Sequence, residues 1–284
     1  MSRLTKITDH VYWMKPGKPD RPSLCAVVGS HHTLLLDAGS SAAHTRSFLE
    51  AMTAEGIHPP RYVALTHWHW DHVFGASEIG ATLIAQRGTA AELTLMGGYE
   101  WTDAALDERA KEGKQTPEGV GHIKEELPAP RTVIIAQPDI VFDERLEIRL
   151  GDVTCQIEHV GGDHSPDSSI IYVAEDRLLF LGDCLYDAIY TPMRHYTREK
   201  LFPLVDKILQ FDAEQFVEGH GDIVMSRAQM EAMIGKMRLV ATLVEQLGTD
   251  ENAVRAAVTA QQTLDEDSEY FIRTLIAGRI LAQN

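Results

Sequence analysis

Four side chains of the kinds that bind metal ions fall within six positions of this chain. They follow the apolar stretch that ends at Leu65, and they are His67, His69, Asp71 and His72. In an extended segment, residues two positions apart point the same way, so His67 and His69 can face one ion together. If the following residues turn into a helix, Asp71 and His72 can face a neighbouring ion. Imidazole and carboxylate ligands suit zinc, and also iron or manganese.

Three later polar segments each follow a predicted apolar strand. They contain His164, the Gly182-Asp183-Cys184 triplet and the Gly219-His220-Gly triplet. Strand ends are where α/β folds collect their sites, and glycine lets the backbone approach an ion closely. The predicted metal ligands divide into His67, His69 and His164 for one ion, and Asp71, His72 and His220 for the other, with Asp183 as the bridge.

The elements that must position these side chains alternate between strands and helices. Apolar runs and turn residues predict strands at 11–14, 24–28, 33–36, 61–65, 82–85, 133–135, 140–142, 146–150, 153–160, 169–173, 178–181 and 215–218. Helices are predicted after Ser40 or Ser41, near 73–79, from Gly88, and over 199–209. Beyond Asp222 only helical spacing remains, with helix starts predicted at Asp250 and at Asp265 or Asp267. This order predicts a layered α/β fold with mixed sheets.

Composition excludes several classes of function. Acidic residues outnumber basic ones, 42 to 26, so the formal net charge is −16 and no nucleic-acid partner is expected. No apolar run reaches the roughly 18 residues of a membrane span, so no membrane partner is expected. The first residues contain no apolar signal-peptide region, and the three cysteines form no C-x-x-C pair. These features together predict a cytoplasmic location.

The motifs as a set resemble those of one known family. The motifs T-H-x-H-x-D-H, G-x-H, G-D and G-H-G, together with an early L-L-D-A-G, are similar to the five motifs of the metallo-β-lactamase superfamily of hydrolases, over roughly residues 10–225. The resemblance implies a four-layer αββα sandwich of two mixed β-sheets, with a dinuclear metal site at one edge. It also implies that Asp37, in the first motif, supports the metal-binding loop.

The resemblance divides the chain into regions. Residues 1–225 are expected to form the catalytic domain, with an inserted lid or side element over about 97–130. Residues 226–284 are expected to form a helical extension packed on it. Methionines repeat at helical spacing in this extension, which predicts core packing, with a homodimer contact as the alternative.

Two features resemble the secreted β-lactamases of the family. His164-Ser-Pro-Asp-Ser is similar to their H-T-x-D-N, and Cys184-Leu is similar to their metal-binding cysteine. Their substrate-binding lysine would align with Asp187, which has the opposite charge, so β-lactam hydrolysis is expected only as a side activity. Asp183 is favoured over Cys184 as the ligand, because a carboxylate can bridge two hard ions. His69 disfavours the flavodiiron branch, which has glutamate there.

The glyoxalase II and lactonase-like branch supplies the favoured function. It implies a hydrolase that uses two divalent metal ions, with zinc favoured and iron or manganese as alternatives, and a metal-bridging hydroxide to cleave a small ester, thioester or lactone. Asp71 would orient the nucleophile or carry a proton, and Tyr186 would hydrogen-bond the substrate carbonyl or the ring oxygen. The alternatives are a phosphodiesterase or β-lactam hydrolase, a mononuclear-iron persulfide dioxygenase, and a non-catalytic ligand-binding relative.

The remaining polar and aromatic residues near the motifs are given structural or surface roles. Trp68 and Trp70 are expected to pack the metal-binding loop. Tyr190, Arg194, His195 and Tyr196 lie in a loop between two of the metal motifs, so some of them could line the pocket, but each one individually is expected on the surface. His122, in the inserted segment, would reach the site only if that segment is a lid.

Overall fold

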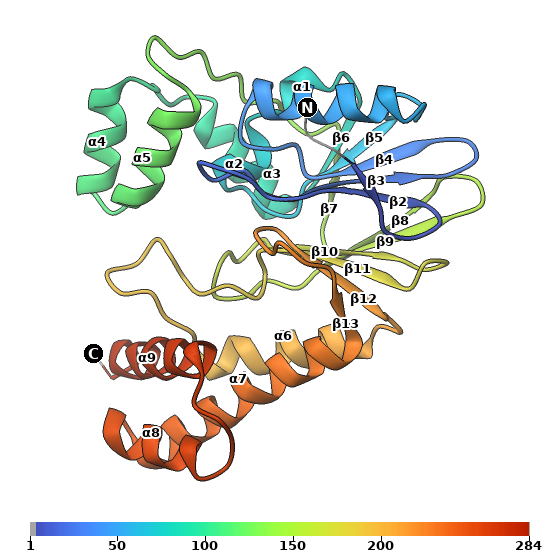
Figure 1. Cartoon of the computed structure of the whole chain (residues 1–284). Helices are drawn as coiled ribbons and strands as arrows, with labels where there is room; N and C mark the ends of the chain where they lie inside the picture. The colour runs from blue at the N-terminus through green and yellow to red at the C-terminus, as the bar shows by residue number, and fades with distance from the viewer. Residues whose placement is uncertain (1–3, 284) are drawn as a thin grey trace.

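Two mixed β-sheets lie face to face between layers of helices (Figure 1). The structure is a computed structural model that describes residues 4–283. Residues 1–3 of the predicted catalytic domain and Asn284 of the predicted extension lie outside the described residues. The predicted αββα sandwich is confirmed.

The first sheet has the strand order β1-β2-β3-β4-β5-β6-β7. Its strands are β1 (Thr5–Lys6), β2 (Val11–Met14), β3 (Leu24–Val28), β4 (Thr33–Leu36), β5 (Tyr62–Ala64), β6 (Thr82–Gln86) and β7 (Ile140–Phe142). The first four pair antiparallel, which confirms the predicted hairpin of β3 and β4, and β4 to β7 run parallel. Helices α1 (Ala42–Ala54) and α3 (Arg87–Met96) connect the parallel strands. The Ser41 side chain caps α1 by accepting a hydrogen bond from the His44 amide.

The second sheet has the strand order β13-β12-β11-β10-β9-β8. Its strands are β8 (Arg145–Arg149), β9 (Thr154–His159), β10 (Ser169–Val173), β11 (Leu178–Gly182), β12 (Gln215–Glu218) and β13 (Met225–Ser226). Only β11 and β12 are parallel among the pairs in this sheet, and helix α6 (Arg198–Gln210) lies between them in the chain. The carboxyl ends of β11 and β12 therefore lie at the same edge.

Buried side chains form three layers of apolar core. One lies between the first sheet and its helices and includes Phe48 and Leu35. The second fills the space between the sheets and includes Phe180. The third lies between the second sheet and the C-terminal helices, where Met230 and Met237 are buried. The methionine stripe is therefore core packing within this chain, as predicted.

The last helices cover the outer face of the second sheet. They are α7 (Arg227–Leu247), α8 (Glu251–Thr259) and α9 (Glu266–Leu281). Asp250 and Asp265 cap α8 and α9 by accepting backbone hydrogen bonds, so the predicted helix starts are confirmed. No helix within residues 4–283 is long and apolar enough to cross a membrane.

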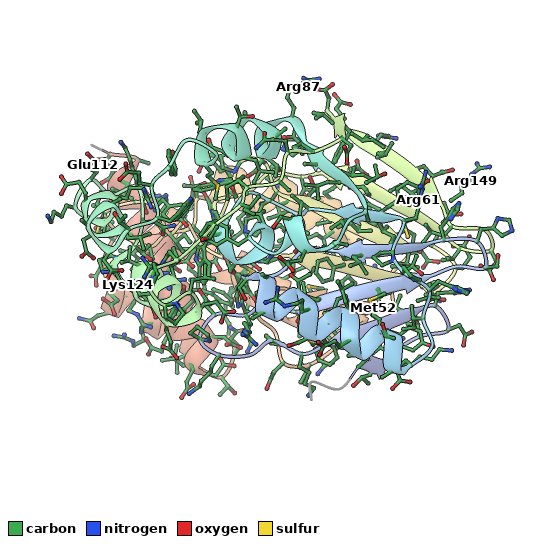
Figure 2. All side chains as sticks on the ribbon, turned by 90° about the horizontal axis from the view of Figure 1, so that it is seen from above. Met52, Arg61, Arg87, Glu112, Lys124 and Arg149 are labelled. Atoms are coloured by element: carbon green, nitrogen blue, oxygen red, sulfur yellow. The ribbon has the colours of Figure 1, made fainter. Side chains whose placement is uncertain are left out.

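The inserted segment folds as a helical hairpin at one end of the molecule. It contains α4 (Asp103–Lys111) and α5 (Pro117–Glu126), and α5 begins with the Thr116 side chain accepting from the Gly119 amide and with proline at its first turn. Figure 2 shows Glu112 and Lys124 of this hairpin at the end opposite to Arg61 and Arg149.

Two local predictions differ from the structure. The strand predicted at 133–135 is wrong, because this segment runs outside both sheets, although Val133 and Ile135 still pack on the core of the first sheet. The helix predicted near 73–79 is divided into α2 (Trp70–Val73) and a single 3-10 turn, η1 (Ala76–Glu78).

Candidate metal centre

The side chains predicted to bind metal meet at one edge of the sandwich, where strands of both sheets end. His67 follows β5 in the first sheet, and α2 presents Asp71 and His72. Asp183 follows β11 and His220 follows β12 in the second sheet. Because parallel strands share a carboxyl edge, residues that are distant in sequence are brought to one place.

The predicted ligands fall into the two groups that the sequence indicated. The ligand atoms within each group lie within 4.8 Å of one another, and the groups are His67, His69 and His164, and Asp71, His72, Asp183 and His220. Each group takes side chains from both halves of the sandwich. All seven predicted ligands are therefore brought together in this structure.

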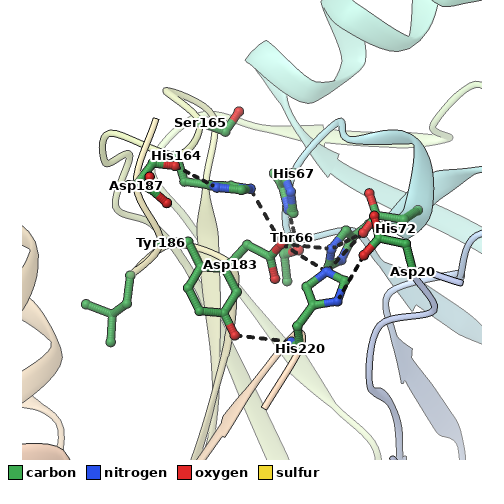
Figure 3. Close-up of polar contacts among 12 residues, drawn as sticks. Asp20, Thr66, His67, His72, His164, Ser165, Asp183, Tyr186, Asp187 and His220 are labelled. Atoms are coloured by element: carbon green, nitrogen blue, oxygen red, sulfur yellow. Dashed lines mark hydrogen bonds and ion pairs between the residues drawn. The ribbon is translucent and has the colours of Figure 1, made fainter. Parts of the chain in front are cut away.

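Asp183 belongs to the second group and also approaches His164 of the first group (Figure 3). Its Oδ2 atom is 3.3 Å from His72 Nε2, 3.4 Å from His220 Nε2 and 3.4 Å from His164 Nε2. Cys184, the alternative ligand, instead packs in the apolar core beneath the second sheet, where burial raises the pKa of its thiol. This geometry suits Asp183, rather than Cys184, as a bridge.

Buried ligand atoms without a partner test whether a cation fits. Among the described residues, the Nε2 atoms of His67, His69 and His164 are buried and have no hydrogen-bond partner, and neither has Asp183 Oδ1. An unpaired polar atom in the interior costs about 1–3 kcal/mol, and the ligand nitrogens of the three histidines lie within 4.8 Å of one another, so their grouping requires an explanation. A cation bound between them would supply the missing partner of each atom.

The charge states in the two groups differ. Burial lowers the pKa of His67, His69 and His164, so their imidazoles are neutral and each has a lone pair for a ligand bond. Burial opposes charge on His220 as well, but Asp183 and Asp71 raise its pKa to about 10. The proton on His220 thus balances nearby carboxylates, which is the electrostatic role that a metal cation would take over.

Outer contacts orient the imidazoles. His72 Nδ1 lies 2.8 Å from Asp37 Oδ2, and Asp37 also accepts hydrogen bonds from the amide and hydroxyl of Thr66 at 2.7 and 2.9 Å. His164 Nδ1 lies 3.1 Å from the backbone oxygen of Asp187. Fixing Nδ1 in this way leaves Nε2 directed at the other predicted ligands, the usual arrangement around histidines that bind a metal. The supporting place of Asp37, implied by the resemblance, agrees with these contacts.

A cavity of about 620 Å³ opens onto both groups. Its floor includes Asp71, Asp183 and His220, and helix α5 and the loop after β11 form its walls. The volume is in the range of small-molecule sites. Tyr186, the predicted substrate contact, lines the cavity, and its hydroxyl accepts a hydrogen bond from the His220 amide at 3.3 Å.

Residues of the loop after β11 were individually expected on the surface, with lining of the pocket by some of them as the alternative. Tyr190 lines the cavity and stacks on Trp68 with ring centroids 5.3 Å apart. Arg194 also lines it and forms a bidentate ion pair with buried Asp187, at 2.8 and 2.9 Å. Tyr196 is buried in the third core layer instead. No motif marks these residues, because the path of the long loop between β11 and α6 determines which of them face the cavity.

Asp20, Gln115 and the α5 residue His122 also line the cavity. Sequence reasoning assigned neither Asp20 nor Gln115 to the site, and it placed His122 there only if the inserted segment is a lid. Asp20 lies in a proline-rich turn whose sequence predicts only a turn. Its position beside the metal centre depends on tertiary packing, so no local signal identifies it.

Gly219 allows the closest approach in the site. A Cβ atom at this position would lie 1.9 Å from Asp183 Oδ1. We expect Gly219→Ala to displace Asp183, to reduce metal uptake and to lower stability by about 1–3 kcal/mol. Metal content and a thermal melt measure both effects. Gly235→Ala is the control: nothing lies within 4 Å of its Cβ in α7, so it should raise stability by up to about 1 kcal/mol. Equal metal content in the two variants would contradict the prediction.

Comparison with known proteins agrees with this geometry. A sequence model of the metallo-beta-lactamase superfamily matches residues 19–220. A linear primary-alkylsulfatase from Pseudomonas sp. is 24% identical over 232 residues, which is 72% of this chain and 42% of that protein, so the chain spans less than half the length of this relative. The acyl-coenzyme A thioesterase MBLAC2 of Gallus gallus is 26% identical over 214 residues, 71% of this chain and 73% of that protein.

A solved structure shows the same fold. A metallo-beta-lactamase family protein from Thermus thermophilus superposes with a TM-score of 0.63 at 18% sequence identity, over 98% of this chain and 95% of that chain.

Proposed function

The chain belongs to the metallo-β-lactamase superfamily, and from this premise we propose that it is a dinuclear metal-dependent hydrolase of a small ester, thioester or lactone. The observation that carries the proposal is the group of unpaired, buried Nε2 atoms of His67, His69 and His164, which lies beside a second group of ligands through the approach of His164 to Asp183. Zinc is the favoured ion, with iron or manganese as alternatives, because the ligands are imidazoles and carboxylates.

The residues of the site have different proposed roles in hydrolysis. Two bound ions would lower the pKa of a water to about 7 and polarise a substrate carbonyl. In this proposal Asp71 orients the attacking water and holds its proton; its carboxylate lines the cavity and lies 3.1 Å from His220 Nε2, which supports this role. Asp183 and the histidines hold the site rigid, so the substrate meets preorganised charges.

Tyr186 supplies a hydrogen-bond donor to the substrate oxygen in this proposal. Its oxygen already accepts from the His220 amide, so its own proton is free to point into the cavity. We expect Tyr186→Phe to lower kcat by about 10²-fold, the lower range for loss of one oxyanion donor. Steady-state kinetics measures this, with metal content as the control for an intact site. A wild-type kcat in Tyr186→Phe would remove the residue from the mechanism.

A thioester is the first substrate class to test. The thiol released from a thioester has a pKa of about 8.5, so it can leave as the thiolate with little need for a proton donor. Pro117, Ile189 and Pro192 in the cavity wall offer apolar surface for an acyl group. The similarity to an acyl-coenzyme A thioesterase supports the same class.

A second candidate is the hydrolysis of an alkyl sulfate ester. The similarity to a linear primary-alkylsulfatase favours it, although the match covers only 42% of that relative. The same apolar wall would then contact an alkyl chain. A panel containing thioesters, lactones, carboxylic esters, alkyl sulfates, phosphodiesters and β-lactams separates these classes by kcat/KM.

Elemental analysis of the purified chain, before any metal is added, is the first test. About two divalent ions per chain is the result expected of a two-metal hydrolase. A single iron would favour the persulfide dioxygenase alternative, which oxygen consumption with a persulfide then tests. A chain that holds no metal, and takes up none on titration, would overturn the proposal.

A further inference from the structure

Two histidines of the second ligand group have the same arrangement of contacts. His72 directs Nε2 at Asp183 and has Asp37 at its Nδ1 side, 2.8 Å away. His220 likewise directs Nε2 at Asp183, and its Nδ1 side faces Asp20 Oδ1 at 3.6 Å. Figure 3 shows Asp20 beside His220 on the side away from Asp183. Asp20 therefore lies on the same side of His220 as Asp37 does of His72, at a longer distance, although no motif contains Asp20.

Asp20 has a second partner on the inserted hairpin. Its Oδ2 atom lies 3.1 Å from Nδ1 of His122 on α5. Asp20 and both of its histidine partners line the cavity, and all three are only partly exposed. One carboxylate thus contacts a predicted metal ligand through one oxygen and the hairpin through the other.

The next residue of the same turn holds α5 a second time. Arg21 forms a bidentate ion pair with Glu126, with Nε–Oε2 and Nη2–Oε1 distances of 2.9 Å, and the Glu126 side chain is only 2% exposed. The Ser41 hydroxyl donates to the same carboxylate. His122 and Glu126 are four residues apart in a helix and so lie on one face, which faces the turn that contains Asp20 and Arg21. These contacts of His122 and Glu126 hold one face of α5 against the turn.

We propose that Asp20 is a positioning residue shared by the metal centre and the hairpin, so that the seating of α5 and the orientation of His220 are coupled. The inference rests on the proposed function, because it takes His220 as a metal ligand. When α5 is seated, His122 restrains the Asp20 carboxylate, and that carboxylate fixes the His220 ring. When α5 moves away, Asp20 loses one of its two restraints, and the ring is held less firmly.

Through this coupling the hairpin would influence the second ligand group, in addition to forming part of the cavity wall. Gln115, Glu118 and Gly119 line the cavity beside the ligand groups, so a substrate that contacts this wall favours the seated hairpin. Substrate binding would then also tighten the second ligand group. The hairpin would affect the rate of the reaction as well as the affinity for substrate.

The test uses Asp20→Asn and His122→Asn in the full chain. Asp107→Asn is the matched control, because it removes an ion pair to Lys124 of α5 that lies on the solvent side of the hairpin. Zn²⁺ affinity is measured by competition with a chromophoric chelator. Hydrogen exchange of the amides in residues 97–130 reports how firmly the hairpin is seated, and neither measurement depends on a substrate.

Asp20→Asn is expected to weaken the second Zn²⁺ equivalent by about 10- to 100-fold, the usual effect of losing a contact behind a ligating histidine, and to speed exchange in α5. His122→Asn should speed the same exchange and weaken the second equivalent by less. Asp107→Asn should leave Zn²⁺ affinity unchanged. Kinetics should show a lower kcat in Asp20→Asn at metal saturation, besides any change in KM.

Two results would overturn the inference alone. One is wild-type affinity for both Zn²⁺ equivalents in Asp20→Asn, and the other is weakened affinity with unchanged exchange in α5, which would leave Asp20 without a connection to the hairpin. A wild-type chain that binds no Zn²⁺ would instead overturn the proposed function, and this inference with it.

Discussion

Asp71→Ala is expected to lower kcat/KM by about 10²- to 10⁴-fold while the fold survives, because the variant loses the carboxylate proposed to orient water and hold its proton. Asp71 Oδ2 lies 3.2 Å from His72 Nε2 and 3.1 Å from His220 Nε2, so the variant also loses one contact of the second ligand group. The first group, which contains no Asp71 atom, should still bind one ion. Kinetics and metal analysis on the same preparation separate the two effects.

Asp222→Ala is a matched control for Asp71→Ala. Asp222 follows the Gly-His-Gly motif, is exposed and is not part of the cavity wall. It should have wild-type kinetics, and circular dichroism should show the same secondary structure in both variants. Near-normal turnover by Asp71→Ala would remove this residue from the proposed mechanism.

Removing metal with a chelator is expected to abolish hydrolysis and to lower the melting temperature. A ligand present at about 1,000 times its Kd stabilises the folded state by about 4 kcal/mol, which for a chain of this size is on the order of 10 °C. The physical reason is specific to this site, because three buried imidazole nitrogens and one buried carboxylate oxygen lose their only partner. Calorimetry on the treated and untreated chain measures the shift.

Adding back Zn²⁺ should restore both activity and melting temperature. Chelator that has already been saturated with Zn²⁺ is the control, since it differs only in its free binding capacity. Full activity in a chain shown by elemental analysis to contain no metal would contradict the metal-dependent mechanism. Restoration by Fe²⁺ or Mn²⁺ but not by Zn²⁺ would keep the mechanism and change the ion.

The ligand groups could be predicted because residue types and short spacings in the sequence identify them. Ligand residue types occur at strand ends, and parallel strands bring such ends together whatever the loops do. His67 and His69 also satisfy the two-residue spacing of an extended segment, and α2 turns His72 towards the second group, as the spacing indicated. The family resemblance then named the sandwich fold, which the order of elements alone would not have named.

The cavity walls could not be predicted in the same way. Arg194 was expected on the surface, yet it lies at the cavity because Asp187 holds it there through seven residues of irregular loop. Asp20 reaches His220 only in the folded chain, where its turn packs against α5 and the Ser23 amide donates to the Gly219 carbonyl beside His220. The segment at 133–135 has the apolar residues of a strand, but Val133 and Ile135 use them to cover the core while their backbone leaves the sheet.

The division of each ligand group between the two halves of the sandwich has a consequence for a nascent chain. His67, His69, Asp71 and His72 leave the ribosome early, whereas His164, Asp183 and His220 follow only with the second sheet. Neither group can be completed until that sheet has emerged and docked on the first. The proposed metal loading is therefore expected to come late in biogenesis, after the first four predicted ligands have been synthesised as an incomplete set.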